Sequence, residues 1–166
     1  MCVDKLVHEL LTLLRELLAG QDRLLKLAVA RREAMRVFDI ARLETLAAQE
    51  RTEALRMADL DRRRQGLVGQ FRAVLGKGAE ATVSEIARRV NEPARSQLLG
   101  LAAQLKETVA QVERSTRINA TISETVVKSL AKVLKVVTGL AQHAGLYMRN
   151  GRKAAMRGIH LLEVTA

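Results

Sequence analysis

The chain has 166 residues, of which 28 are Lys or Arg and 18 are Asp or Glu, giving a formal net charge of +10. Aromatic residues make up only 2% of the chain and there is a single Cys, which excludes a disulfide framework and a multi-cysteine metal site. The remaining apolar residues are mainly Leu, Val and Ala, and together with Arg and Glu they are typical of long helices rather than of strands.

The start of the chain has no pattern of a targeting or membrane-spanning segment. Asp4, Arg15 and Glu16 interrupt its leucine-rich sequence, and no stretch of about 20 apolar residues occurs anywhere. We therefore expect a cytoplasmic protein without an integral membrane segment.

The first predicted helix extends from Val3 to about Arg36. Apolar residues recur along it at steps of three and four, which indicates one buried face; they are Leu6, Leu10, Leu13, Leu17, Leu24 and Leu27. A break is expected at residues 37–39, where Asp39 can cap the next helix.

The second predicted helix covers residues 40–75. Its seam repeats the same spacing through Leu43, Leu46, Glu50, Glu53, Met57, Leu60, Arg64, Leu67, Phe71 and Val74. Because Glu50, Glu53 and Arg64 are charged, we expect them to pair with the neighbouring helix or to contact water.

Glycines at positions 76 and 78 end the second helix, and a short helix to about Val90 is predicted next. The stretch from Thr82 to Glu85 has the spacing of a capping box, and Pro93 marks the start of a third long helix. The third helix has an unbroken heptad seam from Leu98 to Ala144. Its middle is polar, because Thr116, Asn119 and Ser123 occupy successive seam positions, and we interpret them as a structural polar seam that fixes the register.

The last 22 residues differ from the rest of the chain. Glycines at 145, 151 and 158 disfavour an isolated helix, yet the segment offers a discontinuous apolar face formed by Leu146, Tyr147, Met148, Met156, Ile159, Leu161, Leu162 and Val164. Such a segment is typical of one that orders on a partner.

These elements predict an all-α protein. Three long coiled-coil-like helices form an elongated antiparallel helical bundle, with one short helix and a flexible C-terminal segment. We divide the chain into a helical bundle domain over residues 1–144 and a partner-binding tail over residues 145–166.

Motifs for catalysis or metal binding are not found in the sequence. His8, His143 and His160 have no second His or Cys and no paired carboxylates three or four residues further on, and no glycine-rich phosphate loop occurs. We predict no enzyme activity, no catalytic residues, no metal, no cofactor and no small-molecule substrate.

The basic excess is spread evenly over the chain. Residues 1–97, 98–144 and 145–166 have net charges of +4, +3 and +3. A nucleic-acid-binding protein more often concentrates its charge on one element and adds aromatic residues. The spread argues against nucleic acid as the partner, but a basic helical nucleic-acid- or ribosome-associated protein and a structural coiled-coil protein remain as alternatives.

The order of features resembles the flagellar export chaperones of the FlgN family. The leucine-rich first helix and Leu60 with Arg64 in the second match that family's pattern, and so do Asn119 and the pair Ser129-Leu130 in the third. Thr116 stands where the family has a first asparagine. The sequence LYMRNG is similar to the family's Tyr-Gly-x-x-Gly signature: Tyr147 and Gly151 match, and Met148 replaces the first glycine.

The resemblance implies a cytoplasmic chaperone for type III protein export in flagellum biogenesis. It would bind the C-terminal helical regions of hook-associated (hook-filament junction) proteins, prevent their premature assembly and deliver them to the flagellar export gate. The residues that the resemblance assigns to client and export-gate binding are Leu146, Tyr147, Met148, Gly151, Met156, Ile159 and Leu162.

Overall fold

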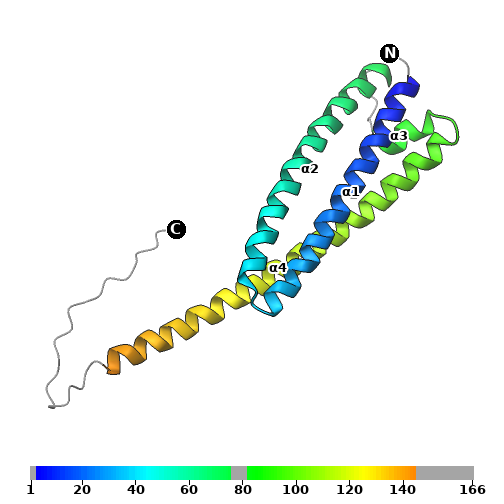
Figure 1. Cartoon of the computed structure of the whole chain (residues 1–166). Helices are drawn as coiled ribbons and strands as arrows, with labels where there is room; N and C mark the ends of the chain where they lie inside the picture. Colours follow the sequence, from blue (N-terminus) through cyan, green and yellow to red (C-terminus); the bar gives the residue numbers. More distant parts are fainter. Residues whose placement is uncertain (1–2, 76–81, 145–166) are drawn as a thin grey trace, which may run out of the picture. The chain divides into compact units, whose positions relative to one another are not determined.

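The computed structural model describes residues 3–75 and 82–144 (Figure 1). Its helices are α1 (Val3–Arg36), α2 (Ile40–Leu75), α3 (Val83–Arg88) and α4 (Ala94–Ala144). The described residues contain no strand, so the predicted all-α bundle, with three long helices and a short one, is confirmed. The chain divides into two compact units, residues 1–122 and 123–166. The predicted domain boundary after residue 144 stays a prediction.

In the first unit, α1 packs against α2 and also contacts the first part of α4 (Figure 1). α1 and α2 form an antiparallel hairpin, whereas α4 runs parallel to α1. The parallel direction follows from two contacts: Arg15 donates to Gln97 at 3.1 Å, and Arg32, further along α1, donates to Ser115 at 2.8 Å. α1 therefore has to satisfy two neighbours at once.

The hydrophobic core lies at one end of this unit. It combines the first half of α1 with the second half of α2, the short α3 and the beginning of α4; its buried members are Leu6, Val7, Leu10, Leu11, Leu13, Leu14, Leu17, Leu60, Leu67, Phe71, Ile86, Ala87 and Leu98. Phe71, one of the three aromatic residues of the chain, is among its largest fully buried side chains. Burial of these side chains supplies most of the driving force for folding of the unit.

The other half of the α1–α2 hairpin buries fewer large side chains and adds two charged pairs between the helices. Arg31 donates to Glu50 at 2.6 Å, and Arg23 Nε lies 2.9 Å from Glu53 Oε2 in an ion pair without hydrogen-bond alignment. The expectation that the seam carboxylates pair with the neighbouring helix is confirmed for both. Arg64, the third charged seam residue, is exposed and bonds to Asp61 on its own helix at 2.8 Å.

Side-chain caps define where the helices begin. Asp39 Oδ1 accepts a hydrogen bond from Arg42 N at 3.0 Å, which confirms Asp39 as the cap of α2. Thr82 accepts from Glu85 N at 3.2 Å at the start of α3, whereas the Glu85 carboxylate pairs with Arg88 and Arg89. The capping-box prediction is therefore confirmed for its threonine half.

Two glycines on helices give a first test of the packing. A Cβ added at Gly66 would meet nothing within 4 Å, whereas one added at Gly20 would overlap the Met57 sulfur. Since Ala is better than Gly in a helix interior by about 1 kcal/mol, Gly66→Ala should raise the free energy of unfolding by up to about that amount, and Gly20→Ala should gain clearly less. Urea denaturation followed by circular dichroism measures both changes.

Met57→Ala provides the control for this comparison. In that background the overlap is removed, so Gly20→Ala should gain about as much as Gly66→Ala. Equal gains for the two glycine variants in the wild-type background would contradict the described packing of Met57 on Gly20.

The start of α4 gives a second test, because Glu92 accepts hydrogen bonds from Ser96 Oγ at 2.6 Å and from Ser96 N at 3.2 Å. These bonds, the hydroxyl bond first, lower the pKa of Glu92 below its ordinary value of 4.5. A lowered pKa in the folded state means that the carboxylate stabilises the fold above about pH 4.5, and that this contribution is lost as the pH falls through the folded-state pKa.

Glu92→Gln should therefore lower the melting temperature at pH 7, and its difference from wild type should shrink as the pH approaches 3. Thermal melts between pH 7 and pH 3 measure this, with Glu44→Gln as the control because Glu44 is exposed and has no polar partner among the described residues. A Glu92→Gln difference that is independent of pH would show that the carboxylate charge does not stabilise the start of α4.

Candidate partner-binding surface

The residues predicted to bind clients and the export gate lie outside the described residues. These are Leu146, Tyr147, Met148, Gly151, Met156, Ile159 and Leu162, all beyond the end of α4 at Ala144. Their assignment stays a prediction.

The described part of the second unit, residues 123–144 of α4, has an exposed apolar surface. We call it the α4 apolar face; its residues are Val127, Leu130, Val133, Leu134, Val136 and Val137, each between 54% and 65% exposed. Six large apolar side chains on about three turns of one helix form a patch of the kind that marks an interaction site.

Lysines occupy the opposite side of the same segment. Lys128, Lys132 and Lys135 follow one another at steps of four and three, so they form one stripe. At 3.6 residues per turn, Lys132 points roughly 200° away from Leu130. Lys128 pairs with Glu124 at 2.6 Å. The lysine stripe thus lies away from the α4 apolar face, which is free of charged side chains.

The sequence analysis placed Leu130, Val133 and Val137 in the seam between helices, and the structure corrects this, because all three are exposed. The heptad pattern is continuous from Leu98 onward and gives no sign of the change. The available signal was length: α4 has 51 residues, whereas α1 has 34 and α2 has 36. Neither partner helix is long enough to line the whole seam.

Within the first unit, the polar seam is built around Asn119, which is buried. Its Nδ2 donates to the carbonyl oxygen of Ala28 at 2.7 Å, and its Oδ1 accepts from Arg32 Nε at 3.1 Å. Arg32 also donates to Ser115 Oγ at 2.8 Å. These bonds join α4 to α1, and the role of Asn119 in fixing the register between the two helices stays a prediction.

Thr116, in contrast, does not belong to this polar cluster. It is exposed, and the buried residue is its neighbour Ser115. Ser123 is half-buried. From Leu98 to Ile122 the buried residues of α4 are Leu98, Ser115 and Asn119, and the half-buried ones are Leu101, Ala102, Leu105, Thr108, Val109, Val112 and Ile122. Every predicted heptad position in this range is therefore buried or half-buried except Thr116, beside which Ser115 is the buried residue.

The arginine cluster of α2 is neutralised within the bundle. Arg62 pairs with Asp59, Arg63 with Glu16 on α1 at 2.6 Å, and Arg64 with Asp61. Hydrogen bonds from Arg64 and Gln65 lower the pKa of Asp61, so this carboxylate keeps its negative charge beside the arginines.

Over residues 3–75 and 82–144, no cluster of His, Cys, Asp and Glu side chains has an arrangement that could hold a metal ion. None of the helices in the same ranges combines the length and apolar character needed to cross a bilayer.

The polar cluster yields a prediction that separates Ser115 from Thr116. Asn119→Ala would remove one buried and one partly buried hydrogen bond and should lower the free energy of unfolding by about 1–3 kcal/mol, and Ser115→Ala should lower it by about 1 kcal/mol. Thr116→Ala should change it by less than about 0.5 kcal/mol because the side chain is exposed. Chemical denaturation of the three variants measures this order; a larger loss for Thr116→Ala than for Ser115→Ala would favour the heptad prediction over the described register.

No curated protein and no solved structure matches the chain. The family model described as FlgN protein matches residues 1–155, which include all of the described helices. The match thus extends over nearly the full length of the sequence and confirms the resemblance found in its motifs, and the chain belongs to the FlgN family.

Proposed function

We propose that this protein is a cytoplasmic chaperone that binds hook-associated proteins through their C-terminal helical regions and delivers them to the flagellar type III export gate. Membership of the FlgN family gives the general role, a flagellar export chaperone, and this is a family of chaperones rather than of enzymes. The clients, the binding surface and the delivery step are our proposal.

The single observation that supports client binding is the α4 apolar face. Leaving six large apolar side chains in water opposes the hydrophobic effect, which favours their burial by roughly 25 cal/mol per Å² of apolar surface. A client helix with its own apolar stripe would cover them, in the way that amphipathic helices generally dock on grooves and helix faces.

The width of the face favours a helical client. On a heptad numbered from the seam, Leu130, Val133 and Val137 occupy the two core positions, and Val127, Leu134 and Val136 occupy the flanking positions on both sides. A stripe this wide exceeds what one two-stranded coiled coil needs and suits contact with more than one helix. Client chains whose free ends are paired helical segments fit this requirement.

The segment over residues 145–166 is proposed to extend the same surface. It follows α4 directly in sequence, and Tyr147 combines an apolar ring with a hydroxyl group, a combination that is enriched at interaction hot spots. We propose that Leu146, Met148, Gly151, Met156, Ile159 and Leu162 act with Tyr147 on the client and the export gate.

Replacement of apolar side chains of the α4 apolar face by charged ones tests the proposal. Leu130→Glu combined with Val137→Glu should weaken binding to the purified C-terminal region of a hook-associated protein by about 30-fold or more, equivalent to about 2 kcal/mol, because two central apolar contacts are replaced by charges. Isothermal titration calorimetry measures the affinity. Helical circular dichroism should stay unchanged, since both side chains are exposed.

Leu55→Glu is the matched control, because Leu55 is 69% exposed but lies on α2; it should leave the affinity unchanged. Deletion of residues 145–166 is tested in parallel and should also reduce binding. If the double variant binds as tightly as wild type, the α4 apolar face is not the client surface, and if the deletion alone has no effect, the tail assignment is wrong.

A further inference from the structure

The turn between α1 and α2 places an aromatic residue where a glycine is normally found. Phe38 has φ 55°, in the left-handed region, and is the residue with positive φ that is not glycine among the described residues. Two hydrogen bonds close the turn: Phe38 N donates to Met35 O at 3.4 Å and Asp39 N donates to Ala34 O at 3.0 Å. This is the Schellman pattern at a helix C-terminus, in which the left-handed position favours Gly because a Cβ is crowded there.

The same turn exposes three apolar side chains to solvent. We call Val37, Phe38 and Ile40 the hairpin tip; they are 71%, 62% and 61% exposed. The phenyl ring of Phe38 therefore contributes little burial in return for its unfavourable backbone conformation. Neither the stability nor the solubility of the folded chain accounts for an aromatic residue at this position, and strained residues of this kind often belong to binding sites.

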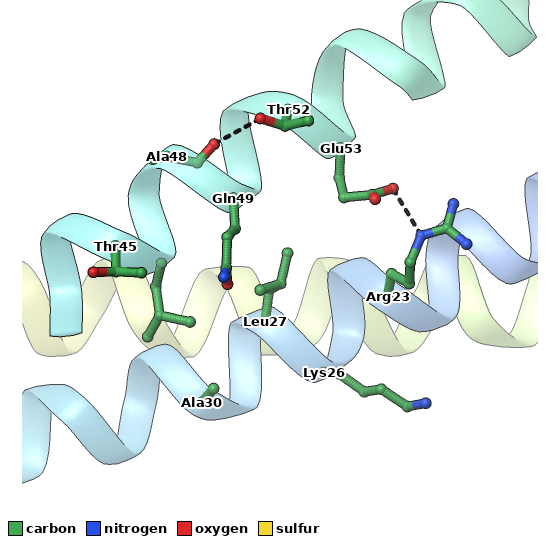
Figure 2. Close-up of a pocket in the computed structure, with 10 residues that line it drawn as sticks. Arg23, Lys26, Leu27, Ala30, Thr45, Ala48, Gln49, Thr52 and Glu53 are labelled. Atoms are coloured by element: carbon green, nitrogen blue, oxygen red, sulfur yellow. Dashed lines mark hydrogen bonds and ion pairs between the residues drawn. The ribbon is translucent and has the colours of Figure 1, made fainter.

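An apolar groove lies between α1 and α2 in the half of the hairpin that is closest to this tip. Its floor and walls are formed by Leu27 and Ala30 of α1 and by Leu46 and Ala48 of α2, and its volume is about 810 Å³. Figure 2 shows Gln49 and Glu53 of α2 pointing towards Leu27 and Arg23 of α1 across it. The groove exists because small and polar residues replace leucines in this half of the hairpin, which leaves space between the helices.

We propose that the α1–α2 groove of one copy receives the hairpin tip of a second copy, in a reciprocal two-fold dimer. Both features belong to the first unit, residues 1–122, and each is apolar and without a partner in the single chain. In such a dimer the tip-in-groove contact forms twice, so the groove and the hairpin tip of each copy are both covered. This inference is independent of the proposed client function, which rests on α4.

The spacing along the hairpin fits such an exchange. From Ile40 to Ala48, α2 rises about 12 Å, so the groove begins within about two helical turns of the tip. Two hairpins laid antiparallel with their ends overlapping by this distance would place each tip over the groove of the other. Because the exchange is reciprocal, the contact closes as a dimer and does not propagate into fibres.

The lining of the groove suits an apolar tip, and salt separates a second copy from an acidic partner. Of its charged side chains, Arg23 and Glu53 pair with each other at 2.9 Å and Lys26 is exposed, while the other lining residues are apolar or uncharged. The two copies repel each other through their net charge of +10, and added salt screens this repulsion. Dimerisation should therefore strengthen with salt, whereas binding of an acidic protein would weaken.

The expected dimer is weak. An overlap of two hairpin ends buries less than the roughly 1,200 Å² of a standard stable interface. Sedimentation velocity of the full chain between about 5 and 500 µM, at low and high salt, should show a monomer–dimer equilibrium whose dimer fraction rises with concentration and with salt. A monomer at every concentration and salt level would overturn the proposal.

Phe38→Gly is the most informative variant, because it should raise the melting temperature of the monomer and lower the dimer fraction. Glycine relieves the left-handed backbone and should raise the melting temperature, measured at dilute monomer concentration, by about 2–4 °C. It removes the phenyl ring and should reduce the dimer fraction at least several-fold. A lower melting temperature would show that Phe38 packs within its own chain, and an unchanged dimer fraction would show that the tip is not the contact; either result overturns the proposal.

Two further variants locate the groove side of the contact. Ala48→Arg fills the exposed edge of the groove on a helix that tolerates arginine, and should reduce the dimer fraction as Phe38→Gly does. Leu55→Ala removes an equally exposed apolar side chain of α2 outside the tip and groove and should leave it unchanged. If Leu130→Glu abolishes dimerisation while Ala48→Arg does not, the α4 apolar face forms the dimer and the proposal is wrong.

Cross-linking provides a direct measurement of the contact. In a Cys2→Ser background, Phe38→Cys combined with Ala48→Cys should oxidise to a covalent dimer. The rise of α2 between these positions exceeds the 4.4–6.8 Å that a disulfide spans between Cα atoms, so the bond must form between two copies. Ala48→Cys alone and Phe38→Cys with Leu55→Cys are the controls, and a yield no higher than theirs would contradict the tip-in-groove geometry.

Discussion

The fold depends on the leucine-rich first half of α1, which has to satisfy two neighbours at once. Leu6, Leu10, Leu13 and Leu17 are buried between α2, α3 and the start of α4, and no other stretch of the described chain is buried on so wide a face. Such a helix cannot be stable with one partner, because half of its apolar surface would remain in water. The hairpin with α2, the short α3 across the end and the parallel direction of α4 all follow from covering this segment.

Away from this core, the helices make fewer apolar contacts and more polar contacts, which are predicted to specify their register. Ion pairs and the cluster around Asn119 hold the second half of α1 between its neighbours. Partly exposed ion pairs contribute little stability, about 0–1 kcal/mol each, but we expect a buried amide that bonds to Ala28 and Arg32 to allow one register. The α1–α2 groove and the exposed tip at Phe38 both belong to this loosely packed half, where new contacts can form without disrupting the core.

In this member of the FlgN family, the buried core and the exposed α4 apolar face are separate surfaces. A protein that escorts unassembled helical subunits needs an exposed apolar surface that does not make the protein aggregate. On α4 the lysine stripe supplies positive charge on the side of the helix opposite the α4 apolar face, which opposes self-association. The leucine-rich core and the α4 apolar face are made of different residues, so a client bound to that face, as proposed, would leave the contacts of the core in place.

The sequence by itself determined the helices, because periodicity and caps are local. The break at residues 37–39, the cap at Asp39 and the start at Thr82 could all be read from it, and its motifs indicated the family. Only the tertiary structure decided which side of α4 faces α1. Thr116 and Ser115 are adjacent on a stripe several residues wide, and a heptad pattern does not decide which of two neighbouring positions is buried. The exposure of Leu130 and the left-handed backbone of Phe38 were likewise set by tertiary packing, since a seam predicts a partner but not how far that partner extends, and a turn predicts a break but not the conformation that closes it.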